Sequence, residues 1–312
     1  MRRTALVTGA TGVLGPILVR GLVREGWAVR ALCRRAPAPG LFPIGVEVRP
    51  GDVTEPGDVA AAAEGADTVF HLAGLLHVLR PEASLAPLYE SVNVGGARSV
   101  AAAAGRHGAA VVFFSSIVVY GETRGGPVDE SAPLRPVGGY AATKRRAEEV
   151  FLNAGLPVTV LRLAAVYGRR MKGNYRRLAD SLSRRRFVPV GDGSNRRTLV
   201  YEEDAARAAI LAAASVRDRP GLYNVTDGAT HSMKEIIGAI CAALGRTEPR
   251  RALPVPIARA AALAVGRGAL LAKYLENVEV SGERIRRELG FEPAYGLERG
   301  WCEALASEVR PR

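Results

Sequence analysis

The stretch Ala5-Leu-Val-Thr-Gly-Ala-Thr-Gly-Val-Leu-Gly15 decides the fold. An apolar run from Ala5 to Val7 predicts a buried strand, three glycines follow at three-residue spacing, and an apolar pattern from Val13 to Val23 predicts a helix that ends at Gly26. Glycine suits a turn in which the backbone bends sharply and a diphosphate comes close to it. The free amides at the start of the helix would then face an anion. The stretch therefore predicts a dinucleotide site; the alternative is a tight strand–helix turn that is merely rich in glycine.

Composition places the chain among ordinary globular proteins. It has 312 residues, of which 48% are hydrophobic and 24% charged, and this length allows a substantial core. The net charge of +12 would attract anions such as nucleotides, nucleic acid or acidic lipid. However, only four of the 43 basic residues are lysine, and no basic stretch interleaves with aromatic residues. Genome bias therefore explains the charge, and no nucleic-acid partner is expected.

The three cysteines lie far apart and show no metal-ligand spacing. Their small, odd number indicates a reducing compartment, so we expect a cytoplasmic protein without a metal site. The first strand begins directly at the N-terminus, so no signal peptide is expected.

The most apolar long stretch runs from Ala252 to Leu271. It contains Pro254, Pro256, Arg259 and Arg267, which interrupt any membrane-spanning helix, so no transmembrane segment is expected. Two interpretations stay open. The stretch lies on a membrane surface, or it forms a helix packed on the protein body. The second is favoured.

Strand-like and helical patterns alternate along the first half of the chain. Strands are predicted at Ala28–Cys33, Val46–Pro50, Thr68–Gly74, Ala110–Phe114 and Val158–Arg162, and helices around Ala60–Ala63, Leu88–Ala104 and Tyr140–Phe151. This alternation predicts an α/β Rossmann fold, a doubly wound parallel sheet whose ligand lies at the carboxyl ends of the strands. We expect a dinucleotide-binding domain over residues 1–165 with a returning segment at 200–225. Residues 166–199 and 226–312 should form a smaller, mostly helical substrate lobe.

Two positions after strands concern the choice of cofactor. The second strand runs into Cys33-Arg34-Arg35, where a NAD-binding protein usually has an acidic residue. A guanidinium there can bind a 2′-phosphate, which favours NADP(H) over NAD(H); the alternative is that the arginines are solvated and NAD is accepted. Asp52 follows the third strand and could accept a hydrogen bond from the adenine amino group. An Asx turn or helix N-cap at Asp52 is compatible with that role.

Three side chains could carry the chemistry. Ser116 ends the fifth strand at the functional edge of the sheet, and Tyr140 and Lys144 share a face of the next helix. A phenol titrates near about 10, but a lysine ammonium and a cationic nicotinamide would favour the phenolate, so that Tyr140 can act as acid or base. The hydroxyl of Ser116 could hold the substrate oxygen during hydride transfer. Singly, each residue has an ordinary structural explanation, as a turn cap or a surface pair. Their order after the glycine turn indicates an enzyme.

The longer motifs fall in one order along nearly the whole chain. They are Thr8–Gly15 (TGxxGxxG), Gly51–Val53, His71–Gly74, Asn93–Val94, Phe114–Gly121, Tyr140–Lys144 (YxxxK), Leu161–Gly168, Gly191–Gly193, Arg197–Asp204 and Glu288–Pro293. With them the sequence resembles the extended short-chain dehydrogenase/reductase family, in its NAD-dependent epimerase/dehydratase group. The resemblance implies a catalytic triad of Ser116, Tyr140 and Lys144, with Lys144 also holding the nicotinamide ribose.

The resemblance also implies ligands and an assembly. The expected substrate is a nucleotide sugar, whose diphosphate Arg197 would bind, with Ser116 as the second substrate-binding residue. A homodimer would form through the helices that contain Val92–Ala104 and Tyr140–Phe151. The implied cofactor-binding residues are Gly9, Thr11, Gly12, Val13, Leu14, Gly15, Cys33, Arg34, Arg35, Asp52, Val53, Leu72, Ala73, Gly74, Asn93, Ser115, Tyr140 and Lys144.

Departures from the family pattern narrow the chemistry. Sugar dehydratases carry an acidic pair directly after the catalytic hydroxyl residue, where this chain has Ile117 and Val118, so dehydration is not expected. Ala165 stands where an asparagine usually contacts substrate, and Asn93–Ala97 departs from the usual Asn-Val-x-Gly-Thr.

Three functions remain open. We expect first a nucleotide-sugar epimerase that acts at C4 by transient hydride removal and return. The alternative is an NADPH-dependent 4-ketoreductase of a nucleotide sugar or another small carbonyl compound, which the arginines after the second strand favour. The remote alternative is a non-catalytic dinucleotide sensor, although such proteins typically lose the tyrosine or the lysine.

Overall fold

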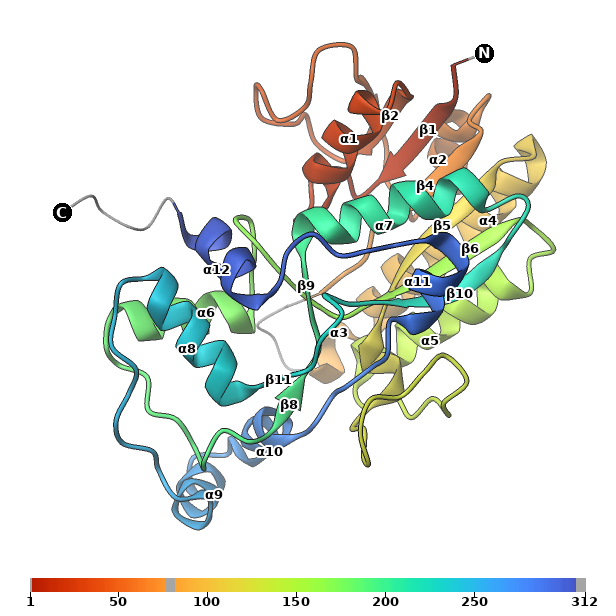
Figure 1. The fold of residues 1–312 in the computed structure, drawn as a ribbon. Helices are drawn as coiled ribbons and strands as arrows, with labels where there is room; N and C mark the ends of the chain where they lie inside the picture. The colour runs from red at the N-terminus through yellow and green to blue at the C-terminus, as the bar shows by residue number, and fades with distance from the viewer. Residues whose placement is uncertain (1, 77–81, 307–312) are drawn as a thin grey trace.

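A parallel sheet forms the centre of the molecule. The computed structural model describes residues 2–76 and 82–306 (Figure 1). Seven strands lie in the order β10-β6-β5-β4-β1-β2-β3, and every pairing is parallel. Their bounds are β1 Thr4–Thr8, β2 Ala28–Cys33, β3 Glu47–Pro50, β4 Thr68–His71, β5 Ala110–Ser116, β6 Val158–Leu163 and β10 Gly221–Val225. The predicted α/β Rossmann fold is confirmed. The order of the strands reverses between β1 and β4, where such sheets bind their ligands.

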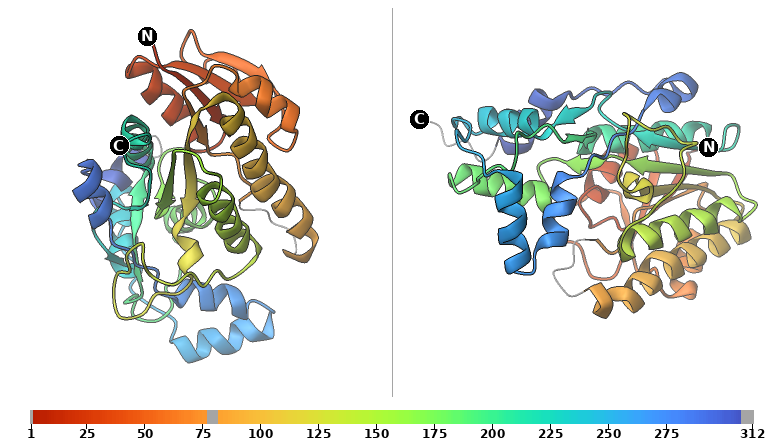
Figure 2. Two further views of the ribbon diagram at one scale, coloured as in Figure 1. Left: turned by 90° about the vertical axis from the view of Figure 1, so that its right-hand side faces the viewer. Right: turned by 90° about the horizontal axis from the view of Figure 1, so that it is seen from below.

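Helices cover both faces of the sheet (Figure 2). Helices α1 (Gly15–Arg24) and α7 (Glu202–Ser215) pack on one face, and α2 (Pro56–Ala63), α4 (Gly96–His107) and α5 (Gly139–Leu152) pack on the other. A sheet covered on both faces has no polar side, so its strands are continuous apolar runs. The residues of β5 from Ala110 to Ser115 are accordingly all buried.

A second core lies beyond the sheet. Helices α6 (Asn174–Ser183), α8 (Met233–Ala243) and α12 (Leu297–Leu305) enclose it. In this core the rings of Tyr167 and Trp301 stack with centroids 4.6 Å apart. Two short sheets adjoin it, made by β7 (Ala165–Tyr167) with β9 (Leu199–Tyr201) and by β8 (Arg196–Arg197) with β11 (His231–Ser232). The chain from Met233 onward is mostly helical, as expected, and the predicted division into two domains stays a prediction.

The apolar stretch near the C-terminus forms a projecting helical hairpin. Helices α9 (Val255–Ala264) and α10 (Gly268–Leu275) extend from the body at the bottom of the left view of Figure 2. Ala258 is the one buried residue of the two helices. The favoured expectation of a helix packed on the body is therefore wrong. Gly266-Arg267-Gly268 divides the stretch into two short helices, and these pack on each other. Within the described ranges, no helix combines the length and apolarity needed to cross a membrane.

Candidate active site

The glycine turn after β1 has the shape that a diphosphate requires. Gly9 has φ +70°, and a Cβ added there would lie 2.6 Å from the backbone nitrogen of Ala73. A Cβ on Gly15 would overlap the backbone of Ala10. Helix α1 then begins without a side-chain cap from its N-cap residue, Leu14, so its first amides point to an anion site at the switch point of the sheet. These features fit a bound dinucleotide.

The three cofactor-binding residues predicted at the end of β2 differ in their exposure to solvent. Cys33 is buried in the core, and burial raises the pKa of its thiol. Arg34 and Arg35 are exposed, and Nη1 of Arg34 lies 4.0 Å from Oδ2 of Asp52. Oδ1 of Asp52 accepts hydrogen bonds of 3.0 Å from both the backbone nitrogen and the hydroxyl of Thr54, which confirms the Asx turn. The arginine side chains are therefore available to a ligand, whereas the thiol is not.

Three of the predicted residues converge at the carboxyl end of β4. Lys144 is 5% exposed, and its Nζ donates a 2.7 Å hydrogen bond to the carbonyl of Phe114. A Cβ added to Gly74 would lie 3.5 Å from that Nζ and 3.4 Å from Oδ1 of Asn93. The structure thus brings Gly74, Asn93 and Lys144 together. A Cβ at position 74 would make ordinary van der Waals contact with both polar groups.

Asn93 lies in a π-helical segment that the sequence did not predict. Residues 88–104 were expected to form one helix, but α3 (Glu82–Tyr89) is followed by a π-helical turn at Glu90–Gly95 before α4 begins. The wider turn places the Asn93 side chain in the interior, where Oδ1 accepts from the nitrogen of Leu75 at 2.7 Å and Nδ2 donates to Thr143 at 3.0 Å. Such turns recur at functional sites.

Ser116 and Tyr140 meet directly. The Ser116 hydroxyl is close enough to the phenol to affect its pKa, and Ser116 also caps the 3-10 turn Ile117–Tyr120. Burial raises the pKa of the Tyr140 phenol, the nearby Tyr89 raises it further, and the neighbouring Ser116 lowers it. We expected Lys144 to lower this pKa, and the net direction is the opposite because desolvation of the phenolate dominates. Within the protein alone Tyr140 is therefore a protonated acid.

Two neighbouring groups share this buried environment. Burial lowers the pKa of Lys144 to about 8, against the opposing effect of Glu148, so the ammonium still predominates at neutral pH. Burial and the charge of Lys144 lower the pKa of His71 to about 3, so this imidazole is neutral. Its Nδ1 lies 2.8 Å from the hydroxyl of Thr8. Of these two groups, Lys144 therefore carries the positive charge at neutral pH.

Ser115 and Ser116 interact with different residues of α5. Ser116 reaches Tyr140, whereas the hydroxyl of Ser115 donates to Oε1 of Glu148. The predicted role of the Ser115 side chain toward a cofactor therefore has no support from its contacts. This hydroxyl instead leads into a buried polar network.

That network was missed by the analysis of the sequence. Glu148 accepts from Nη2 of Arg162 at 2.7 Å and from Nε at 3.0 Å, and both side chains are at most 4% exposed. Nη1 of Arg162 donates to the hydroxyl of Tyr120, which in turn donates to Oδ1 of Asn224, each at 2.8 Å. One signal was present in the sequence, since Glu148 follows Lys144 by four residues and so shares the catalytic face of α5.

Arg197 lies apart from the triad. Its guanidinium is half-buried, and Nη2 donates to the carbonyls of Lys273 at 2.9 Å and Tyr274 at 3.1 Å. Burial lowers the pKa of this guanidinium, with Tyr175 acting in the opposite direction. The structure therefore connects Arg197 to the end of α10 rather than to Ser116 or Tyr140.

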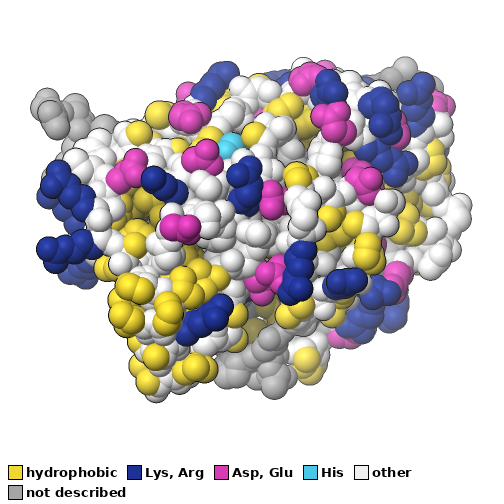
Figure 3. Space-filling view, turned by 60° about the horizontal axis from the view of Figure 1, so that its bottom comes forward, with side chains coloured by type: hydrophobic (Ala, Val, Ile, Leu, Met, Phe, Trp, Pro, Cys, Tyr) yellow, Lys and Arg dark blue, Asp and Glu magenta, His cyan; other side chains and the backbone are white. Residues whose placement is uncertain are grey.

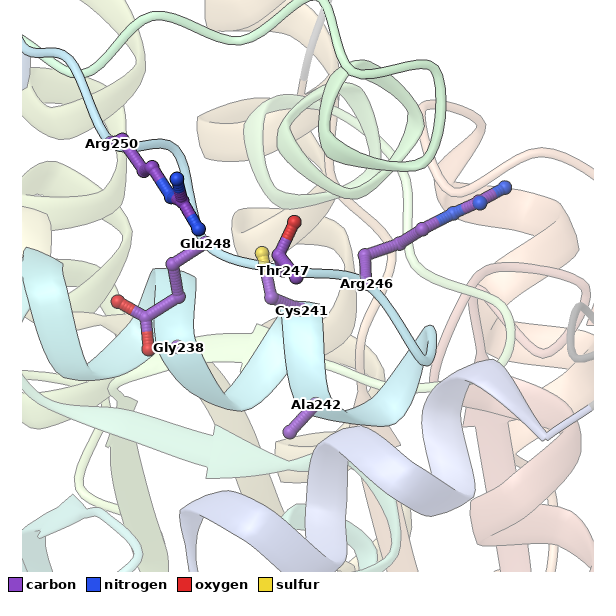
Figure 4. Close-up of a pocket in the computed structure, with 7 residues that line it drawn as sticks. All are labelled: Gly238, Cys241, Ala242, Arg246, Thr247, Glu248 and Arg250. Atoms are coloured by element: carbon purple, nitrogen blue, oxygen red, sulfur yellow. The ribbon is translucent and has the colours of Figure 1, made fainter.

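An open hollow of about 440 Å³ lies elsewhere, at the end of α8 (Figure 4). Its lining residues are Gly238, Cys241, Ala242, Arg246, Thr247, Glu248 and Arg250. None of them is a predicted site residue, and burial raises the pKa of the Cys241 thiol. The hollow is separate from the site at the carboxyl ends of the strands.

Comparison with known proteins decides the family. Residues 5–226 match the NAD dependent epimerase/dehydratase family. The chain belongs to this family. The predicted resemblance to extended short-chain dehydrogenases/reductases and the expectation of an enzyme are both confirmed.

Relatives of this family member differ in their reactions. The chain is 31% identical to the 2-alkyl-3-oxoalkanoate reductase of Stenotrophomonas maltophilia, over 97% of the chain and 99% of the reductase. It is 27% identical to the N-acetyl-alpha-D-glucosaminyl-diphospho-ditrans,octacis-undecaprenol 4-epimerase of Escherichia coli O157:H7, over 82% of the chain and 77% of that epimerase. A solved structure of MoeE5 in complex with UDP-glucose and NAD has 28% identity and a TM-score of 0.79, and the match covers 97% of each chain.

Proposed function

We propose that this family member is a nucleotide-sugar epimerase that acts at C4. The observation that carries the proposal is that Ser116 lies close enough to the Tyr140 phenol to lower its pKa, beside the buried ammonium of Lys144. The Ser116 hydroxyl lies at the carboxyl end of β5, and the Tyr140 phenol and the Lys144 ammonium lie in the first turns of α5. A hydroxyl, a phenol and a fixed cation suit the removal and return of hydrogen at a carbinol carbon. The 4-epimerase relative and the UDP-glucose held by MoeE5 support the choice of substrate class.

The roles of the side chains follow from their contacts. Ser116 would orient the substrate hydroxyl, and Tyr140 would hold or release its proton. Lys144, anchored on the carbonyl of Phe114, would hold the nicotinamide ribose, with the glycine turn holding the diphosphate. A bound nicotinamide cofactor would supply the acceptor and donor of hydride. The guanidinium of Arg197, which lies at the end of α10, would bind the substrate diphosphate.

Dehydration is not part of the proposal. Ile117 is buried directly after Ser116, and Val118 follows it in the 3-10 turn. Neither side chain can take up or release a proton, so this turn offers no acid or base for the loss of water.

The purified protein tests this function. The nucleotide released on denaturation is identified by mass spectrometry, and UDP-sugars are followed for inversion at C4 by NMR. An epimerase keeps its cofactor through turnover, so we expect a stoichiometric nicotinamide dinucleotide and interconversion without added cofactor. A protein that binds no nicotinamide dinucleotide, or one that leaves every UDP-sugar unchanged, contradicts the proposal.

A 4-ketoreductase is the second candidate. The exposed pair Arg34-Arg35 at the end of β2 favours it, because guanidinium groups there suit the 2′-phosphate of exchangeable NADPH. The reductase relative supports this reading. An empty protein that oxidises added NADPH with a 4-keto sugar nucleotide would identify it.

The preference for NADP(H) leads to a prediction about Arg34. Replacing it by alanine should raise the Kd for NADPH by about tenfold or more, because a charge-assisted contact to the 2′-phosphate is lost. The Kd for NADH should change by less than about twofold. Fluorescence titration of both cofactors measures the two values. The matched control is Arg24→Ala, which replaces an exposed arginine at the C-terminal end of α1, the end away from the glycine turn. Equal losses for both cofactors would show that Arg34 does not contact the 2′-phosphate.

The remaining features of the proposal are its assembly, location and domains. We propose a cytoplasmic homodimer that pairs through α4 and α5. The dinucleotide-binding domain covers residues 1–165 and the returning segment 200–225. The substrate lobe comprises 166–199 and 226–312.

A further inference from the structure

The α9–α10 hairpin presents an apolar surface to solvent. Ile257, Leu263, Val265 and Leu270 are 56%, 72%, 66% and 59% exposed. Figure 3 shows hydrophobic side chains gathered over the projecting end of the molecule, at the lower left of the view. A contiguous patch of exposed aliphatic side chains marks an interaction surface rather than ordinary solvent-facing protein.

The charges of the hairpin are of one sign. Between Glu248 and Glu276 the chain has five basic residues and no acidic one. Arg259 and Arg267 are exposed, and neither forms an ion pair with a described residue. Exposed aliphatic side chains combined with unpaired cations are the composition of helices that lie in the interface of an anionic bilayer.

A second copy of the chain fits this surface less well. A twofold interface places the same patch of both copies face to face. The cations Arg259 and Arg267 would then face a patch that also carries only cations, with no carboxylate of the hairpin to pair with them. The homodimer proposed above also uses α4 and α5, which leaves the hairpin free.

The hairpin is tied to the candidate substrate lobe. Nη2 of Arg197 donates to the carbonyls of Lys273 and Tyr274 at the end of α10, and Nδ2 of Asn195 donates to the Tyr274 carbonyl at 2.8 Å. A partner surface that binds the hairpin therefore lies next to Arg197.

We propose that the α9–α10 hairpin docks on an anionic lipid bilayer, inserting its aliphatic side chains among the headgroups and pairing its cations with lipid phosphates.

The test is flotation of the full-length protein with vesicles. We expect it to float with vesicles of phosphatidylglycerol and phosphatidylcholine in equal parts, less with phosphatidylcholine alone, and less at high salt. The double variant Leu263→Glu with Leu270→Glu should lower the partition coefficient by about tenfold or more, because it removes apolar area and adds repulsive charge. Arg259→Ala with Arg267→Ala should lower it by about tenfold.

The control is a pair of exposed apolar residues at the other edge of the molecule. Ile44→Glu with Val48→Glu makes the same change in net charge near β3 and should leave flotation unchanged. Far-UV circular dichroism checks that each variant folds, and vesicle binding is read without any turnover, so failure of the proposed epimerase activity does not affect it. The proposal is overturned if the wild type does not float or if the control loses as much binding as the hairpin variants. It is also overturned if the hairpin substitutions dissociate an oligomer in sedimentation velocity without changing flotation.

Discussion

Replacing Tyr140 by phenylalanine is expected to lower kcat by about 10²–10⁴-fold, the usual contribution of a positioned acid or base. The phenol lies near Ser116 and is kept protonated by burial, so its removal takes away the group proposed to donate and accept the proton of the substrate hydroxyl. Cofactor affinity should change by less than about twofold, since the ring and its packing remain. Steady-state kinetics and fluorescence titration of the cofactor measure the two effects.

Tyr167→Phe is the matched control for this prediction. Its hydroxyl is buried in the second core without a hydrogen-bond partner among the described residues. Removing it should leave kcat unchanged. If Tyr140→Phe retained most of its rate while Tyr167→Phe did not, the assignment of the acid and base would be wrong.

Glu148→Gln is expected to destabilise the protein by about 3–5 kcal/mol. The substitution leaves the guanidinium of Arg162 buried without its counter-charge, because both side chains are almost completely removed from solvent. It also removes the group that raises the pKa of Lys144 against burial. Urea unfolding at neutral pH, followed by circular dichroism, measures the change in stability.

An exposed pair on the same helix provides the comparison. Arg145 and Glu149 form an i,i+4 ion pair on α5 with side chains 45% and 51% exposed. Glu149→Gln should cost less than about 1 kcal/mol, since water screens this pair. The apolar double replacement Glu148→Leu with Arg162→Met should be more stable than Glu148→Gln, because no buried charge is then left alone. Equal losses at positions 148 and 149 would show that the buried pair is not what holds α5 to β6.

Much of the candidate site could be predicted because its residues lie within local motifs. The glycine turn and the end of β4 need particular backbone shapes, and the sequence shows these as glycines at fixed spacing. Tyr140 and Lys144 are one helical turn apart, so their common face follows from the helix period alone. Their meeting with Ser116 also follows from topology, since parallel strands end at one edge of the sheet.

The missed features depend on contacts between distant segments. The π-helical turn at Glu90–Gly95 inserts Asn93 between β4 and α5, which an apolar periodicity typical of an ordinary helix does not reveal. The raised pKa of Tyr140 depends on how much protein surrounds the phenol, and this is a property of packing. The apolar run of the hairpin resembles a core helix in sequence, and only the fold shows that its faces remain in solvent.

The sequence by itself determined the order of strands and helices, the dinucleotide turn and the positions of Ser116, Tyr140 and Lys144. Hydrophobic period, glycine spacing and helix geometry act over a few residues, so they can be read along the chain. The tertiary structure alone decided that Glu148 pairs with Arg162, that Arg197 joins the end of α10 and that the α9–α10 hairpin projects from the body. These outcomes depend on burial and on long-range contacts, because the surroundings of a charge or an apolar face exist only after the chain has folded.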